Sequence, residues 1–179
     1  MPSQTSTPNL ADLEAVPYLN EAGQIPEQFQ GKVGIYAIFN QAQTLQYVGY
    51  SRDIALSLRQ HLMRQPMDCH WIKVQTVDRP SRTLLEGIQD AWIKENGEMP
   101  VGNAAESDRW NQPIDAKPAM TAAEKQQFAQ TDELGQIKLL KKVSRRVEAE
   151  ILETLKQRGV QMDLRFNPKL KEQGLLDLK

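Results

Sequence analysis

Two tyrosines stand beside glycines in opposite order on two consecutive apolar runs of the chain. The word "GIY" ends at Tyr36, and the word "YVG" begins at Tyr47. If the two runs pair as strands that turn midway along the intervening "NQAQ", Tyr36 lies opposite Tyr47 and Gly34 lies opposite Gly49. Such a face carries two phenols beside bare backbone that a ligand could approach closely. The same pattern also suits a purely structural pair of cross-strand aromatics beside bulge glycines.

A β-hairpin and the helix after it must position these tyrosines. The runs 33–40 and 44–50 are rich in β-forming residues and are joined by a polar segment, which predicts the hairpin. The stretch 51–65 predicts a helix, because apolar residues recur every four positions along it. We expect Ser51 to cap its N-terminus.

A third strand and a second helix complete the predicted core. Residues 70–77 alternate as a strand does, and residues 81–97 predict a helix that begins after Ser81 and ends at Gly97. The order β-β-α-β-α predicts an α+β fold, with a small, mainly antiparallel three-stranded sheet flanked by helices.

The segments around this core predict a chain of four parts. The N-terminal part is proline-punctuated, and the stretch 98–120 is too rich in proline and asparagine to predict regular structure. We therefore expect an N-terminal arm (1–30), an α+β domain (31–105), a linker (106–120) and a C-terminal helical extension (121–179).

The extension predicts a long amphipathic helix near 132–158. Thr121 and Glu124 fit a capping box that opens the helical region, and Gly159 ends the long helix. Residues 138–150 of this helix carry five cations: Lys138, Lys141, Lys142, Arg145 and Arg146. Cations on such a helix usually form a solvated face, but faces of this kind also dock on partner proteins. We expect a protein partner on this helix, with DNA or RNA as a further possibility.

Composition bounds the class of protein. The 179 residues are 40% hydrophobic and 25% charged with a net charge of −1, so no global field attracts nucleic acid. Cys69 is the one cysteine, which excludes an internal disulfide and favours a reducing compartment. No apolar run is long enough to cross a bilayer, and the N-terminus lacks a secretory signal. We expect a cytoplasmic or plastid-stromal protein, with a place at the periphery of a membrane complex as the alternative. Zinc is not expected, because Cys69 and His70 have no second ligand pair.

The paired words, their spacing and the β-β-α-β-α order resemble the GIY-YIG nuclease superfamily over about residues 31–105. With its arm and tail, the chain most resembles the short GIY-YIG-domain proteins of cyanobacteria and plastids. The resemblance implies that Glu86 binds metal and that Asn103 matches the late asparagine of the family. It also implies that His61 stands where some members carry a histidine.

This resemblance implies phosphodiester hydrolysis. One Mg²⁺ or Mn²⁺ on Glu86 would polarise the phosphate, Tyr36 would relay a proton from water, and Tyr47 would orient it. The family's helical arginine is replaced here by Ser57, and only Arg52 and His61 remain as candidates to bind phosphate. Losing a cation aimed at a transition state costs on the order of 10²–10⁵ in rate.

With Ser57 in place of the arginine, three functions are open. The first, which we prefer, is a degenerate GIY-YIG-fold protein that binds or assembles a protein or nucleic-acid partner without catalysis. The second is an active, metal-dependent endonuclease. The third is a nucleic-acid binder that does not cut.

Overall fold

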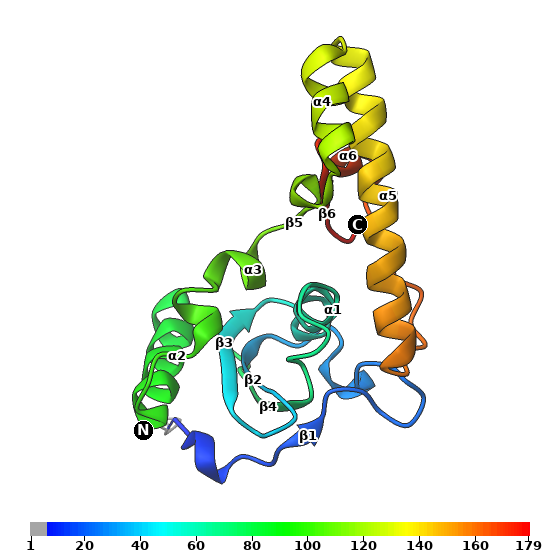
Figure 1. The fold of residues 1–179 in the computed structure, drawn as a ribbon. Helices are drawn as coiled ribbons and strands as arrows, with labels where there is room; N and C mark the ends of the chain where they lie inside the picture. The colour runs from blue at the N-terminus through cyan, green and yellow to red at the C-terminus, as the bar shows by residue number, and fades with distance from the viewer. Residues whose placement is uncertain (1–6) are drawn as a thin grey trace. The chain divides into compact units, whose positions relative to one another are not determined.

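The computed structural model describes residues 7–179 and divides the chain into two compact units, the first ending at Asn111 and the second running from Gln112 to Lys179. Figure 1 shows the elements of both units. The first unit holds η1 (Leu10–Asp12), β1 (Val16–Pro17), η2 (Glu27–Phe29), β2 (Gly34–Phe39), β3 (Leu45–Ser51), α1 (Ile54–Arg64), β4 (Trp71–Thr76), α2 (Arg82–Asn96), η3 (Val101–Asn103) and α3 (Ser107–Asn111). The second holds β5 (Ile114–Asp115), η4 (Lys117–Ala119), α4 (Ala122–Gln130), α5 (Glu133–Gln157), α6 (Pro168–Lys171) and β6 (Leu175–Leu176).

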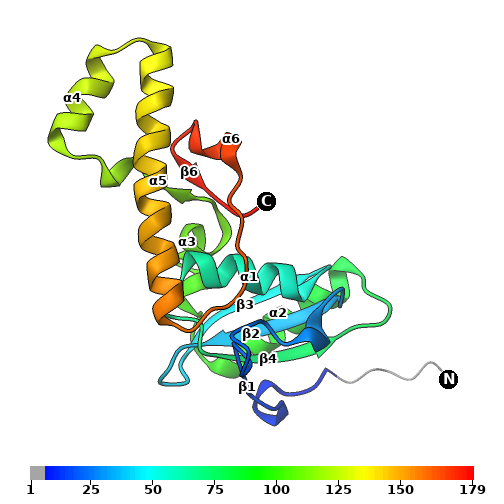
Figure 2. The ribbon, with the colours of Figure 1, turned by 90° about the vertical axis from the view of Figure 1, so that its right-hand side faces the viewer.

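The sheet of the first unit has the order β1-β4-β2-β3, and each of its strand pairs is antiparallel. The α+β class and the mainly antiparallel sheet flanked by helices are confirmed. The predicted count of three strands is wrong, because the N-terminal arm adds a short fourth strand. In that strand Val16 pairs with Ile72, and Pro17 pairs with Trp71. Figure 2 shows the sheet with α1 on one side and α2 on the other.

The hairpin register differs from the predicted one by two residues. Tyr36 pairs with Gly49, and Tyr47 pairs with Ile38. A bulge between Ile38 and Phe39 and a turn residue with positive φ, Gln43 (φ 64°), account for the shift. Because side chains alternate with a period of two, a shift of two keeps both tyrosines on the same face.

The helix caps follow local side-chain chemistry. The N-cap of α1 is Asp53 and not Ser51: Asp53 accepts a hydrogen bond from the Leu56 backbone N–H, whereas Ser51 is the last residue of β3. The predicted ends of α2 are confirmed. Ser81 accepts from the Leu84 N–H, and Gly97 ends the helix in the left-handed conformation with φ 86°.

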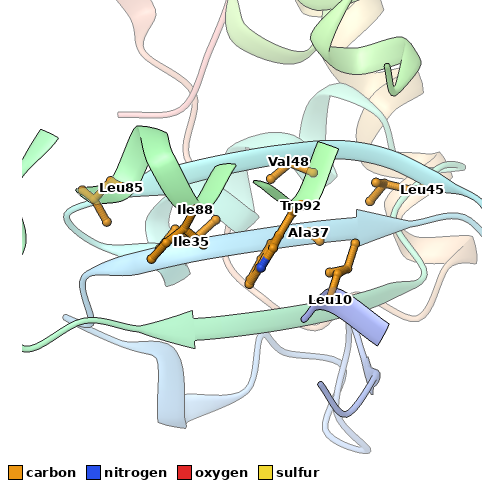
Figure 3. Close-up of a cluster of buried hydrophobic side chains, with 8 residues drawn as sticks. All are labelled: Leu10, Ile35, Ala37, Leu45, Val48, Leu85, Ile88 and Trp92. Atoms are coloured by element: carbon orange, nitrogen blue, oxygen red, sulfur yellow. The ribbon is translucent and has the colours of Figure 1, made fainter. Parts of the chain in front are cut away.

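An apolar cluster between α2 and the sheet forms the core of the first unit. Figure 3 shows Trp92 lying across the strands among the other core side chains. The Trp92 indole donates from Nε1 to the Pro8 carbonyl at 3.0 Å, so the N-terminal arm is tied to α2. The buried members of the cluster are Leu10, Ile35, Ala37, Leu45, Val48, Leu85, Ile88 and Trp92.

The stretch 98–120, predicted to be irregular, contains η3, α3, β5 and η4. Trp110 on α3, in the first unit, is fully buried.

The second unit is built on α5. The predicted capping box is confirmed, with Thr121 and Glu124 bonding each other's backbone N–H groups, and it opens helix α4. Glu124 also accepts two hydrogen bonds from Arg146 of α5. That guanidinium, with the Thr121 N–H, lowers the pKa of Glu124 to about 2. No helix within residues 7–179 is both long and apolar enough to cross a membrane.

Candidate functional site

Four aromatic side chains gather on the α1 side of the sheet, and we call them the aromatic cluster. Tyr36 and Tyr47 come from β2 and β3, His61 comes from α1, and Trp110 comes from α3. Ring centroids lie 6.1 Å apart for the two tyrosines and 4.6 Å apart for Tyr47 and His61. All four side chains are buried, with exposed fractions of 8% or less. The sequence-predicted neighbourhood of the two phenols is thus present, although the register differs.

Tyr36 is held by the imidazole of α1. Its Oη lies 2.8 Å from His61 Nε2, and only 2% of the residue is exposed. Burial raises the pKa of Tyr36 well above its ordinary value, and the neighbouring Tyr47 raises it further. A hydrogen bond from Ser57 and the charge of Arg64 oppose that rise without cancelling it. The Tyr36 phenol therefore stays protonated at neutral pH.

Tyr47 is held by α3. Its hydroxyl donates to Asn111 Oδ1 at 2.8 Å, and its ring stacks on Trp110 with centroids 5.3 Å apart and planes inclined by 2°. Burial raises the pKa of Tyr47, while Asn111 and the charge of Arg64 act in the opposite direction. Tyr47 is also neutral near pH 7.

His61 carries no charge at neutral pH. Burial, together with the positive charge of Arg64, lowers its pKa to about 3. A neutral, 4% exposed imidazole offers no cation to a phosphate. The phosphate-binding role expected of His61 therefore finds no support in its charge.

Arg64 provides the positive charge of the cluster. Its Nη1 donates to the Trp110 carbonyl at 2.9 Å, which ties α1 to α3. Arg64 is not among the phosphate-binding candidates expected from the sequence. Trp110 and Asn111 are not among the expected site residues either, because they fall in the stretch predicted to be irregular. The one available signal was Trp110 itself, the single aromatic residue between 98 and 120.

Glu86 lies with α2 and contacts Tyr50. Its Oε1 accepts from Arg82 Nε at 2.7 Å and from the Tyr50 hydroxyl at 3.2 Å. The bond from Arg82 lowers the pKa of Glu86. Tyr50 lies three residues after Tyr47 on β3, so the two side chains point to opposite faces of the sheet. Glu86, which contacts Tyr50, therefore lies on the face opposite the aromatic cluster.

Asn103 bonds the backbone of β3, and Arg52 is exposed. The Asn103 amide bonds both backbone groups of Val48, with Nδ2 donating to Val48 O and Oδ1 accepting from Val48 N, each at 2.8 Å. The Asn103 side chain thus completes the outer edge of β3. Arg52 is exposed just before α1. Over residues 7–179, no three His, Cys, Asp or Glu side chains group closely enough to hold a metal ion, and Mg²⁺ or Mn²⁺ binding stays a prediction.

Cys69 is buried directly behind the aromatic cluster. None of its surface is exposed, and its Sγ lies 3.6 Å from the His61 carbonyl oxygen, within hydrogen-bonding distance for a thiol. The thiolate is the reactive form of cysteine, and it requires access and a polar environment. Cys69 in this position is an interior packing residue.

Comparison with known proteins gives one informative match. No protein-family model matches the chain. The chain is similar to the bifunctional monothiol glutaredoxin-S16, chloroplastic, of Arabidopsis thaliana, with 35% identity over 99 residues. The match covers 53% of this chain and 32% of the relative, so the chain spans about a third of that protein's length.

This match corrects the family expected from the sequence. The named relative is a glutaredoxin, and the assignment to the GIY-YIG nuclease superfamily is therefore wrong on this comparison. Two functions expected from that assignment are therefore wrong as well: the degenerate binding or assembly factor on that fold, and the active endonuclease. The positions of Tyr36, Tyr47 and Glu86 stand as described, without the phosphodiester chemistry that the resemblance implied.

Proposed function

We propose that this chain works in thiol redox chemistry beside a monothiol glutaredoxin and contributes no reactive thiol of its own. The observation that carries the proposal is the combination of two facts: a bifunctional monothiol glutaredoxin is the named relative, and Cys69 is fully buried. The reactive cysteine would then be supplied by the glutaredoxin. A reducing compartment, such as the cytoplasm or the plastid stroma, suits a chain with a single cysteine.

The protonation of the aromatic cluster supports an accessory role. A general acid or base is most effective when its pKa lies near the working pH. The pKa values of Tyr36 and Tyr47 are raised and that of His61 is about 3, so none of these three groups exchanges its proton near pH 7. The cluster holds β3, α1 and α3 together and offers no group poised for proton transfer.

Two assays test the proposal. Glutathione-dependent reduction of hydroxyethyl disulfide is measured with the chain alone, and binding of the chain to recombinant glutaredoxin-S16 is measured by calorimetry. We expect the chain and its Cys69→Ala variant to be equally inactive, and both to bind the glutaredoxin. Reductase activity that disappears in Cys69→Ala would contradict the proposal, and so would the absence of binding.

A further inference from the structure

The helix α5 presents a long exposed stripe that its own unit does not cover. Seven residues recur along it at intervals of three or four and fall within an arc of about 80°, over about 33 Å. The buried residues of α5, which include Leu139, Val143 and Leu155, lie on the opposite side. We call the exposed line the basic stripe; its residues are Leu134, Lys138, Lys142, Arg145, Ala149, Leu152 and Lys156.

The cations of the basic stripe differ from the other cations of α5. Lys141 pairs with Glu172 at 3.2 Å, and Arg146 pairs with Glu124 at 2.7 Å. In the part of the chain that the structure describes, the four stripe cations have no ion-pair partner. These are Lys138, Lys142, Arg145 and Lys156.

Two acidic residues of α5 lie close to the stripe. Glu148 is one turn beyond Arg145, but it is engaged by Lys171 of α6. Glu153 is one turn before Lys156 and approaches Gln157 at 3.5 Å. The centre of the stripe, from Lys138 to Arg145, is therefore a compact positive surface without an internal counter-charge.

We propose that the basic stripe docks an acidic α-helix of a protein partner. Lys138, Arg145 and Leu152 are spaced by seven residues, as are Lys142, Ala149 and Lys156, so these six residues stay on one face along the length of a helix that lies beside α5. Carboxylates at the facing positions would meet the cations at the centre. Leu152 and Leu134, 40% and 60% exposed, would supply apolar contact towards the two ends, and Ala149 would let the helices approach closely.

The geometry favours a helix over a membrane. A helix that lies on a membrane inserts its apolar face, and the apolar face of α5 is packed inside the second unit around Leu139 and Val143. This inference rests on α5 alone, so it stands or falls independently of the glutaredoxin-related role.

Binding of two synthetic helical peptides to the full chain tests the proposal by fluorescence anisotropy. The peptides share a heptad sequence and differ only in having Glu or Gln at the facing positions. We expect the Glu peptide to bind at least tenfold more tightly than the Gln peptide. The variant Lys138→Glu, Lys142→Glu, Arg145→Glu should lose at least tenfold in affinity for the Glu peptide. A matched control with the same charge change outside the stripe, Lys125→Glu, Lys169→Glu, Lys179→Glu, should stay within twofold.

Further variants separate docking from general charge attraction. Leu152→Gln should weaken Glu-peptide binding severalfold, whereas Met99→Gln, an exposed apolar residue outside the stripe, should not. Phosphatidylglycerol vesicles and duplex DNA serve as competing anionic probes. Equal losses in the stripe and control variants would overturn the proposal. It would also be overturned by stripe-dependent binding to vesicles or DNA in the absence of peptide binding.

Discussion

Tyr36 and Gly49 are paired across the β2–β3 hairpin, and the missing side chain of Gly49 makes room for the phenol. A Cβ at position 49 would lie 2.8 Å from Tyr36 Oη and 2.5 Å from Tyr47 Cε1. The glycine thus allows Tyr36 to reach His61, and it has a packing role that requires no ligand.

Replacing Gly49 with alanine should destabilise the protein by about 1–3 kcal/mol, because the added methyl overpacks two buried rings. Gly87→Ala is the matched control: a Cβ there meets nothing within 4 Å. Gly87 lies inside α2, so the control should gain up to about 1 kcal/mol. Urea unfolding measures both variants. Equal stability of Gly49→Ala and the wild type would show that the rings move aside freely.

The buried His61 should make the protein less stable as the pH falls. Its pKa is about 3 in the folded protein and about 6.5 in the unfolded chain. Between these values the unfolded state binds the extra proton, so stability is lost as pH drops below about 6.5. The slope approaches about 1.4 kcal/mol per pH unit.

Unfolding free energies measured from pH 7 down to pH 5 check this slope. This pH range lies above the one in which most carboxylates titrate. His61→Gln should remove it, whereas His70→Gln should retain it. A wild-type stability that does not change over this range would mean that His61 accepts a proton in the folded state.

Asn103→Ala should cost about 1–3 kcal/mol, because the Val48 N–H loses its partner at the edge of the sheet. The Val48 carbonyl would keep the bond from Gln89 Nε2 at 2.9 Å. Asn96, which is exposed and bonds the Glu98 carbonyl, provides a control whose alanine variant should change stability by no more than about 0.5 kcal/mol. Amide exchange at Val48, faster in Asn103→Ala alone, would report the opened edge directly.

The elements of the fold that depend on local sequence could be predicted. The alternation of side chains predicted the strands β2–β4, and the recurrence of apolar residues every three or four positions predicted the helices α1, α2 and α5. The predicted caps of α2 at Ser81 and Gly97 were correct. These features depend on residues within a turn or two of each other. Long-range pairings could not be predicted this way. Strand β1 forms because Val16 and Pro17 pair with β4, and no local sequence pattern predicts that pairing.

The site likewise combines features that depend on local sequence with features that do not. The alternation of side chains along a strand placed Tyr36 and Tyr47 on one face, but the bulge after Ile38 shifted their register. Trp110 stacks on Tyr47 from a segment remote in sequence, so its place in the cluster was missed. The glycines that suggested a family motif each have a steric explanation, since a Cβ at Gly34 would lie 2.1 Å from the Gln75 carbonyl oxygen. The short motifs "GIY" and "YVG" therefore correctly indicated close packing around glycine. The phosphodiester chemistry that they suggested is not supported by the comparison.

Labelling of the Cys69 thiol in the native chain of residues 1–179 tests the central claim most directly. A thiol with no exposed surface should react with Ellman's reagent only as fast as the protein opens, and fully after denaturation in urea. Slow, unfolding-limited labelling is the result that we predict. Immediate, stoichiometric labelling of the folded protein would contradict the claim that this chain leaves thiol chemistry to a glutaredoxin.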